Sequence, residues 1–265
     1  MYSCSAIEVT RHPGWALLRI ARADSRNAMH RAARSALAAA LAGLAQPAGG
    51  VRAIVITGSG ASFCAGLDLK ERSAEQAAGV PDTAGMEWLE INMALRRHPA
   101  VCIAAVNGLA LGAGVTLINS CDLALASDDA SIGCPEIGFA SYASMAGPTL
   151  QLSGLSRKRA AWMLLTAPRI DALTAERWGL INEVTRAGDL LTRAAALATQ
   201  IAGYDAAALA EVKQTLDHIP AQVADWRGAM EYGQSVNAAI RARTGAAAAG
   251  LAHFALAGRS PDEGD

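Results

Sequence analysis

The chain has 265 residues, of which 52% are hydrophobic and 18% charged, and its formal net charge is -1. This composition is typical of a folded protein with a large core and argues against disorder away from the chain ends. The near-neutral charge weighs against nucleic acid as a partner, because nucleic-acid binding relies on a basic surface.

The cysteine, histidine and N-terminal patterns indicate an intracellular environment. The five cysteines form no C-x-x-C pair and the five histidines are scattered, which predicts buried thiols and no metal site. The N-terminus lacks a basic head followed by an apolar core, so it does not resemble a secretory signal. No apolar run is long enough to span a membrane. We therefore expect a cytoplasmic protein with no membrane partner.

The first two thirds of the chain alternate strand-like and helix-like segments. Apolar and β-branched runs predict strands at 15–20, 51–58, 100–108, 123–127 and within 130–139. Helices are expected from Asn27 to near Pro47 and at 83–97, with a loop at 59–71 between them. The repeated strand–strand–helix order predicts an α/β fold.

Patterns typical of strands disappear after about residue 195, and alanine-rich patterns typical of helices replace them. Helices are expected at 194–202, 205–217, 221–241 and 245–257. This shift predicts a core at 1–195 and a helical region at 196–265 that packs on the core or on another subunit.

Two glycine-containing loops, "FCAGLDL" at 63–69 and "LALGAGV" at 109–115, each follow a buried strand. Small residues at a strand end allow backbone N–H groups to face a ligand. Two such groups converging on one oxygen would form an oxyanion hole for an enolate or a tetrahedral intermediate. The same residues also suit tight turns and close helix packing, so the pattern alone leaves both interpretations open. The chain lacks the G-x-G-x-x-G, P-loop and G-x-S-x-G motifs of other ligand-binding loops.

The segments "RAIVITGSGASFCAGLDLKE" and "CIAAVNGLALGAGVTLINSCDLALAS" resemble the enoyl-CoA hydratase/isomerase (crotonase) superfamily. Further matching stretches are 27–29, 133–139, 165–184 and 253–259, in the family's order. The resemblance implies a spiral of β-β-α units and a C-terminal helical region that forms homotrimers, or hexamers as dimers of trimers. It also implies an acyl-CoA substrate that carries its own coenzyme A, with no permanently bound cofactor.

The resemblance assigns roles to particular positions. It places the substrate's thioester oxygen between the backbone N–H groups of Leu67 and Ala113. Glu136 is the expected acid/base, because its apolar neighbours would raise its pKa, although a strand-end glutamate can also face solvent. The expected coenzyme A contacts are Ala65, Gly66, Asp68, Leu69, Ser25, Arg26, Phe254 and Arg259.

Thr116 and the segment 143–147 depart from the family pattern. Two-glutamate hydratases of the family carry an acid at the position of Thr116, so the chain favours isomerase-type proton transfer by one glutamate. Thr116 either orients water or substrate, or is an inert residue. "ASMAG" replaces a Pro-Gly-x-Gly-Gly stretch, and Tyr142 and Ser144 add hydroxyls near the expected acyl chain.

The sequence therefore predicts enoyl-CoA isomerase or enoyl-CoA hydratase chemistry. The alternatives are a thioester or β-diketone hydrolase or lyase on the same fold, and a non-catalytic scaffold or RNA-binding member. Near-neutral charge and the presence of Glu136 argue against the last of these.

Overall fold

The computed structural model describes residues 6–46, 50–246 and 248–249. It divides into two compact units, Met1–Ala202 and Gly203–Asp265, which are described separately below. Helix α8 (Leu190–Ala202) continues through residue 195, where the sequence predicts the boundary between the two regions.

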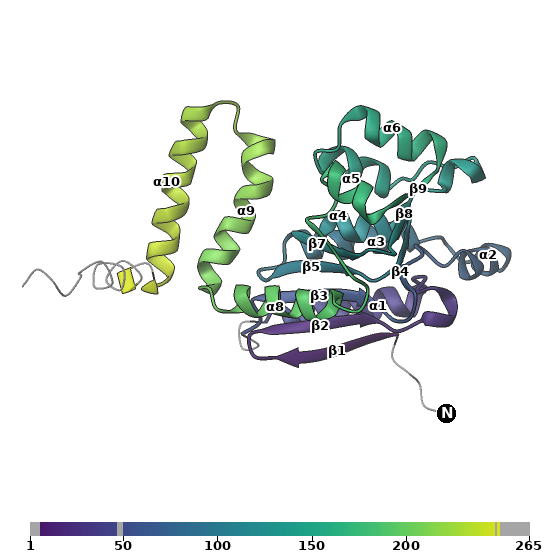
Figure 1. The fold of residues 1–265 in the computed structure, drawn as a ribbon, viewed down its shortest axis with the longest axis horizontal. Coiled ribbons are helices and arrows are strands. Elements are labelled where there is room, and N and C mark those ends of the chain that lie inside the picture. Colours follow the sequence, from purple (N-terminus) through teal and green to yellow (C-terminus); the bar gives the residue numbers. More distant parts are fainter. Residues whose placement is uncertain (1–5, 47–49, 247, 250–265) are drawn as a thin grey trace, which may run out of the picture. The chain divides into compact units, whose positions relative to one another are not determined.

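A six-stranded sheet forms the centre of the first unit (Figure 1). Its order is β1-β2-β3-β5-β7-β10, and only β1 and β2 pair antiparallel. The strands are β1 (Ile7–His12), β2 (Trp15–Ile20), β3 (Ala53–Gly58), β5 (Val101–Val106), β7 (Leu123–Ser127) and β10 (Glu183–Thr185). Every residue of β3 is buried. This explains its continuous apolar sequence, because parallel strands are covered on both faces.

A second, four-stranded sheet has the order β4-β6-β8-β9. Its strands are β4 (Ser62–Cys64), β6 (Leu109–Leu111), β8 (Ser131–Gly133) and β9 (Arg169–Asp171). The first three are parallel, and β9 pairs antiparallel with β8. Each of β4, β6 and β8 follows a long strand of the first sheet, and helices come next in the chain. This succession confirms the predicted spiral of β-β-α units.

Helices enclose the two sheets of the first unit. They are α1 (Arg31–Leu44), α2 (Leu69–Ala77), α3 (Ala84–Arg96), α4 (Ala113–Ser120), α5 (Ala146–Leu152), α6 (Arg157–Thr166), α7 (Ala172–Trp178) and α8. Two short 3-10 helices, η1 (Ala23–Ser25) and η3 (Glu136–Phe139), lie between elements. Helix α8 packs across β2, β3, β5 and β7, whereas α3 packs against α1 and α4.

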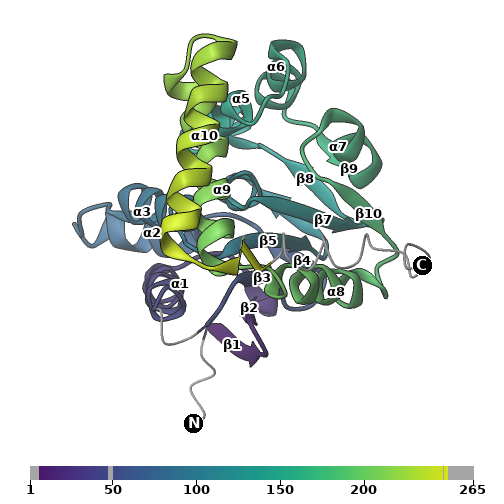
Figure 2. The ribbon, with the colours of Figure 1, turned by 90° about the vertical axis from the view of Figure 1, so that its left-hand side faces the viewer.

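The second unit contains a helical hairpin of α9 (Ala206–Gln222) and α10 (Trp226–Arg243), which lie side by side in Figures 1 and 2. The His218 ring stacks on Tyr232 at 4.2 Å between centroids, and Glu211 pairs with Arg243. These helices confirm the expected helical C-terminal region. Most of the helix expected at 245–257 lies outside the described residues.

Two sequence predictions about local structure were wrong. Helix α1 begins at Arg31 and not at Asn27, because Asn27 adopts a φ of 57° and its side-chain amide donates to Ser59 O and Ser62 O. The segment 59–71 is not only a loop, since it contains β4 and the first turn of α2. Strand β4 is three residues long and depends on pairing with β6, which no local pattern reveals.

The described cysteines Cys64, Cys102, Cys121 and Cys134 are buried thiols outside any disulfide, as expected. Among the described residues, no group of three or more His, Cys, Asp or Glu side chains is arranged to hold a metal ion. No helix within these residues combines the length and apolar character needed to cross a bilayer.

Candidate active site

The three residues expected to act on substrate follow three neighbouring strands. Leu67 lies three residues after β4, Ala113 two residues after β6 and Glu136 three residues after β8. These strands are adjacent and parallel, so their carboxyl ends lie about 4.8 Å apart along one edge of the sheet. Ligands of α/β proteins bind at this kind of edge. The fold therefore brings residues separated by 69 positions into one site.

Backbone hydrogen bonds hold the loop that contains Leu67. Met29 N donates to Gly66 O at 2.8 Å, and Asp68 N donates to Met29 O at 3.3 Å. The intervening Leu67 N–H has no acceptor among the described residues. It is a backbone donor on a loop that is fixed on both sides, as an oxyanion hole requires.

The second backbone donor is at the start of α4. Ala113 is the first residue of this helix, so its N–H has no intrahelical acceptor and lies at the positive end of the helix dipole. Gly66 has a φ of 94°, and a β-carbon there would lie 3.4 Å from Ala113 N and 3.0 Å from Leu111 O. The loop of Leu67 and the start of α4 are therefore in close contact through Gly66.

The Glu136 carboxyl group lies against Gly112, immediately before the second donor. A β-carbon on Gly112 would be 2.3 Å from Glu136 Oε1. Glu136 Oε2 is buried and has no hydrogen-bond partner in the described part of the chain. Burial raises the pKa of Glu136, and a hydrogen bond from its own backbone offsets this only in part. The Glu136 carboxyl group, with its pKa raised by burial, therefore lies against the residue that precedes Ala113.

Thr116 lies one helical turn after Gly112, and its N–H donates to Gly112 O at 3.3 Å. Its side chain is buried, with 1% exposed. Thr116 Oγ1, like Glu136 Oε2, has no partner within the described residues. Unpaired buried hydroxyls are uncommon in proteins, so a bound water or substrate group is a natural partner for both atoms.

A cavity of about 450 Å³ lies beside η3. It is lined by Cys134, Ile137, Ala140, Ser141, Tyr142, Ala143, Gln151, Arg157, Ala160, Ala161, Leu164 and Leu165. Cys134 and Ile137 lie on either side of Glu136 in the chain. The Tyr142 ring fills the space beside Gly147, where a β-carbon would be 2.5 Å from the tyrosine oxygen.

A larger cavity, of about 710 Å³, lies between α1 and α3. It is lined by none of the residues predicted to act on substrate or to bind coenzyme A. The larger cavity therefore does not coincide with the candidate site, which is defined by the strand ends and the unpaired polar atoms.

Three of the other predicted site residues, Ser25, Arg26 and Leu69, flank the Leu67 loop. Ser25 and Arg26 are exposed, and Ala65 N donates to Arg26 O at 3.0 Å. Leu69 is exposed after the loop, and Ser144 is exposed between η3 and α5. Phe254 and Arg259 lie outside the described residues.

Asp68, a predicted coenzyme A contact, makes several contacts within the protein. Its carboxylate accepts from Lys70 N at 3.2 Å and Glu71 N at 3.3 Å, capping α2, and pairs with Arg22 at 3.1 Å. Burial raises the pKa of Asp68, but the Glu71 amide and Arg22 together bring it below its usual value. Asp68 is therefore an ionised cap that stabilises the start of α2.

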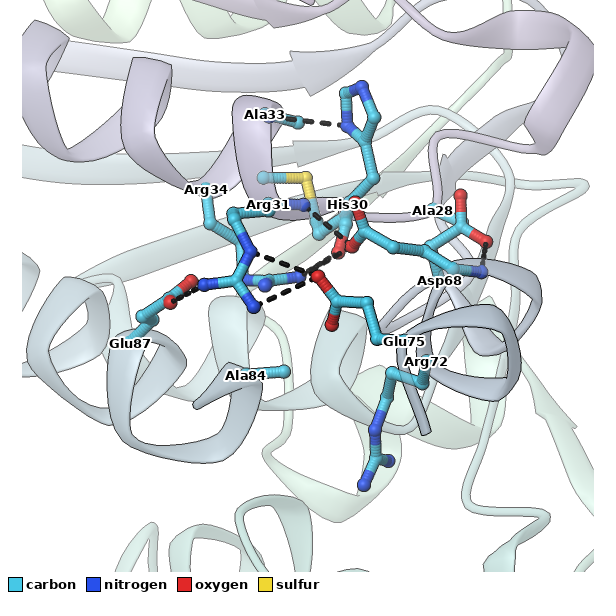
Figure 3. A network of polar contacts seen from close by, with 12 residues as sticks. Ala28, His30, Arg31, Ala33, Arg34, Asp68, Arg72, Glu75, Ala84 and Glu87 are labelled. Atoms are coloured by element: carbon cyan, nitrogen blue, oxygen red, sulfur yellow. Dashed lines mark hydrogen bonds and ion pairs between the residues drawn. The ribbon is translucent and has the colours of Figure 1, made fainter. Parts of the chain in front are cut away.

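Sequence reasoning missed a polar network that joins α1, α2 and α3 (Figure 3). Its central residue is Arg34, which is 1% exposed and bonds Met29 O at 2.9 Å and Glu87 Oε2 at 2.7 Å. Arg31 pairs with Glu75 at 2.9 Å and with Glu87 at 3.1 Å. One signal was visible in the sequence: Arg34 shares the apolar stripe of α1 with positions 37, 41 and 44.

The two sheets of β-β-α units, with backbone donors and a glutamate at the ends of β4, β6 and β8, define a crotonase-type α/β protein. A sequence model described as "Enoyl-CoA hydratase/isomerase" matches residues 10–231. The chain therefore belongs to the enoyl-CoA hydratase/isomerase family.

Curated relatives and solved structures agree with this assignment. The chain is 38% identical over 149 residues to a mevalonyl-coenzyme A hydratase of Aspergillus fumigatus, covering 56% of the chain and 54% of the relative. It is 38% identical over 167 residues to a probable enoyl-CoA hydratase of Mycobacterium bovis, covering 63% and 64%. These matches thus span less than two thirds of each relative. An enoyl-CoA hydratase structure from Bacillus anthracis superposes with a TM-score of 0.85 at 28% identity, covering 95% of this chain and 96% of that one.

Proposed function

We propose that this protein is an enzyme that acts on an enoyl-CoA thioester. The N–H groups of Leu67 and Ala113 bind the thioester oxygen, and Glu136 moves a proton on the acyl chain. The observation that supports this most directly is the position of the Glu136 carboxyl group, which lies against Gly112 beside the Ala113 donor. Backbone hydrogen-bond donors and a carboxylate base at the ends of neighbouring strands suit a reaction in which negative charge develops on the carbonyl oxygen.

The reaction we favour is isomerisation of a 3-enoyl-CoA to a 2-enoyl-CoA. The Glu136 carboxylate removes a proton from the α-carbon, and the electron pair forms an enolate whose oxygen is stabilised by the two N–H groups. The double bond then moves to the α,β position as the protonated Glu136 returns the proton to the γ-carbon. One carboxyl group suffices for both transfers, which agrees with Thr116 replacing a second acid.

Hydration of a 2-enoyl-CoA is the second candidate, and a specific observation favours it. Thr116 Oγ1 is buried without a partner in the described residues and lies one turn from Gly112, where the Glu136 carboxyl packs. A water accepting from this hydroxyl would lose one proton to Glu136 as its oxygen adds to the β-carbon, and the protonated Glu136 would then give that proton to the α-carbon. The names of two relatives, a mevalonyl-coenzyme A hydratase and a probable enoyl-CoA hydratase, agree with this chemistry.

We further propose that the acyl chain lies in the cavity beside η3. The cavity walls include residues on both sides of Glu136 and are mostly apolar. Arg157 is the one cationic side chain among its lining residues. Self-association as a homotrimer or hexamer stays a prediction from the family resemblance.

A screen of 2-enoyl- and 3-enoyl-CoA thioesters by mass spectrometry and ultraviolet absorbance tests the proposal. Isomerisation leaves the mass unchanged and increases the absorbance of the conjugated thioester, whereas hydration adds the mass of one water. Glu136→Gln should lower turnover of the best substrate by about 100-fold or more, because it removes the base. Release of free coenzyme A would instead identify a hydrolase. Turnover that is equal in the parent and Glu136→Gln would refute the assignment of Glu136.

A further inference from the structure

Two consecutive residues of α3 make contacts that lead to the two proposed oxyanion donors. Trp88 bonds the residue that carries one donor, and Glu87 bonds Arg34, which supports the loop that carries the other. We propose that Glu87 and Trp88 set the separation of the Leu67 and Ala113 N–H groups, so that α3 positions the oxyanion hole without touching substrate. This inference rests on the proposed function.

The first contact is direct. Trp88 is fully buried, and its indole N–H donates to Ala113 O at 3.2 Å. A buried indole needs an acceptor, and here the acceptor is the carbonyl of the residue whose own N–H is the proposed donor. Because N–H and C=O of one residue are linked by only two soft torsions, holding the carbonyl restricts the direction of the Ala113 N–H.

The second contact acts through one further residue. Glu87 Oε2 accepts from Arg34 Nε at 2.7 Å, and Arg34 Nη1 donates to Met29 O at 2.9 Å. Met29 O also accepts from Asp68 N, and Met29 N donates to Gly66 O. The Met29 backbone therefore bonds the residues on both sides of Leu67, and Arg34 fixes the Met29 carbonyl.

Helix geometry explains how one element reaches both loops. Consecutive helical residues point about 100° apart, so Glu87 faces α1 while Trp88 faces α4. Helix α3 packs against both of these helices. Arg34 carries a buried charge, which is costly unless it is paired, and Glu87 and Glu71 pair with it at 2.7 Å and 3.3 Å. The cost of burying this charge is consistent with a positioning role, since an apolar residue would fill the same stripe of α1.

Trp88→Phe tests the direct contact, because it keeps an aromatic ring and removes the N–H. Trp162→Phe is the matched control, since Trp162 lies on α6 and is 57% exposed. We expect Trp88→Phe to lower kcat about tenfold while KM changes less than about twofold, because misplacing a donor weakens transition-state binding more than substrate binding. Trp162→Phe should match the parent.

Infrared spectroscopy of bound butyryl-CoA, labelled with carbon-13 at its carbonyl, measures the hole directly. In the parent, hydrogen bonding by Leu67 and Ala113 should lower the carbonyl stretching frequency relative to free butyryl-CoA. Trp88→Phe should return the frequency toward the free value. A kcat and a frequency equal to those of Trp162→Phe would overturn the positioning role. A bound thioester with no frequency change in the parent would instead refute the oxyanion hole itself.

Arg34→Lys and Glu87→Gln test the second contact and decide the proposal even if Trp88→Phe does not fold. Arg72→Lys is the control, because Arg72 pairs with Asp82 in an exposed position. Arg34→Lys should lower kcat and move the carbonyl frequency in the same direction as Trp88→Phe, and Glu87→Gln should do so to a smaller extent. Folded variants of Arg34 and Glu87 that match Arg72→Lys in both readouts would refute the role of this contact.

Discussion

Substituting alanine for Gly112 tests the contact on which the proposed site depends. Gly112 precedes α4 with a φ of 52°, and an added β-carbon would be 2.3 Å from Glu136 Oε1. Real β-carbon contacts essentially never fall below 3.0 Å, and ordinary contact begins at 3.4 Å, so the carboxylate or the backbone must move by about 0.7–1.1 Å. Alanine at this φ also adds backbone strain of about 1–3 kcal/mol.

The expected loss of activity follows from this displacement. In the proposed mechanism, either Glu136 moves away from the substrate's α-carbon, or Gly112 moves and carries the Ala113 N–H with it. A shift of about 1 Å in a catalytic group costs on the order of 100-fold in rate. We therefore expect Gly112→Ala to lower kcat/KM about 100-fold, which corresponds to about 2.7 kcal/mol of transition-state stabilisation.

The assay is turnover of the best thioester from the enoyl-CoA screen, with thermal unfolding measured in parallel. Gly138→Ala is the matched control, since it lies in η3 two residues from Glu136 and an added β-carbon would meet nothing within 4 Å. This control should keep the parent rate. If folded Gly112→Ala is as active as Gly138→Ala, the carboxyl group does not act from its place against Gly112.

Four further outcomes are expected. Burial raises the pKa of Glu136, so kcat/KM should fall at acid pH, and the pH at the midpoint of this fall should lie above the ordinary glutamate range. A midpoint within that range would contradict the effect of burial. The same shift means that the folded state binds this proton more tightly than the unfolded state. The free energy of unfolding of the parent should then decrease as pH rises from the ordinary glutamate pKa through the raised one. In urea titrations, Glu136→Gln should be more stable than the parent at about pH 8 but not at about pH 4. If the Thr116 hydroxyl binds the reacting water, Thr116→Val should lower the rate of hydration about tenfold and leave the rate of isomerisation unchanged. Equal effects on the two rates would exclude that role. Ala161→Phe should narrow the cavity beside η3 and shift the KM preference toward shorter acyl chains, and an unchanged preference would place the chain elsewhere.

Local patterns predicted much of the first sheet and little of the second. The strands at 15–20 and 123–127 match β2 and β7, and the helix at 83–97 differs from α3 by one residue at each end. These segments have a period or an apolar run that is complete within a few residues. Strands β4 and β6 are three residues long, and each is stabilised by pairing with its neighbours in the sheet. Their sequences are therefore hard to distinguish from those of loops.

The candidate site was also predicted only in part from the sequence. Glycines near strand ends and an apolar setting for Glu136 were visible in the sequence, and the family resemblance joined them into one site. The contact of Glu136 with Gly112 crosses 24 positions and depends on the pairing of β6 with β8. Trp88 was missed because its acceptor is a backbone carbonyl, which has no sequence signature. Arg34 was missed because its acceptors are a backbone carbonyl and two carboxylates that are distant in the sequence.

The burial of Glu136 and the identity of residue 116 together bear on the type of reaction. In a two-glutamate hydratase, both acids bind and activate one water molecule. The family resemblance places the neutral hydroxyl of Thr116 at the position of one of these acids. Isomerisation instead requires a single base that holds the abstracted proton until the γ-carbon receives it. A carboxyl group with a pKa raised by burial is suited to this, because its protonated form is stabilised and solvent is excluded from its buried oxygen. In the proposed isomerisation, the burial that raises the pKa of Glu136 would therefore favour return of the proton to substrate over its loss to water.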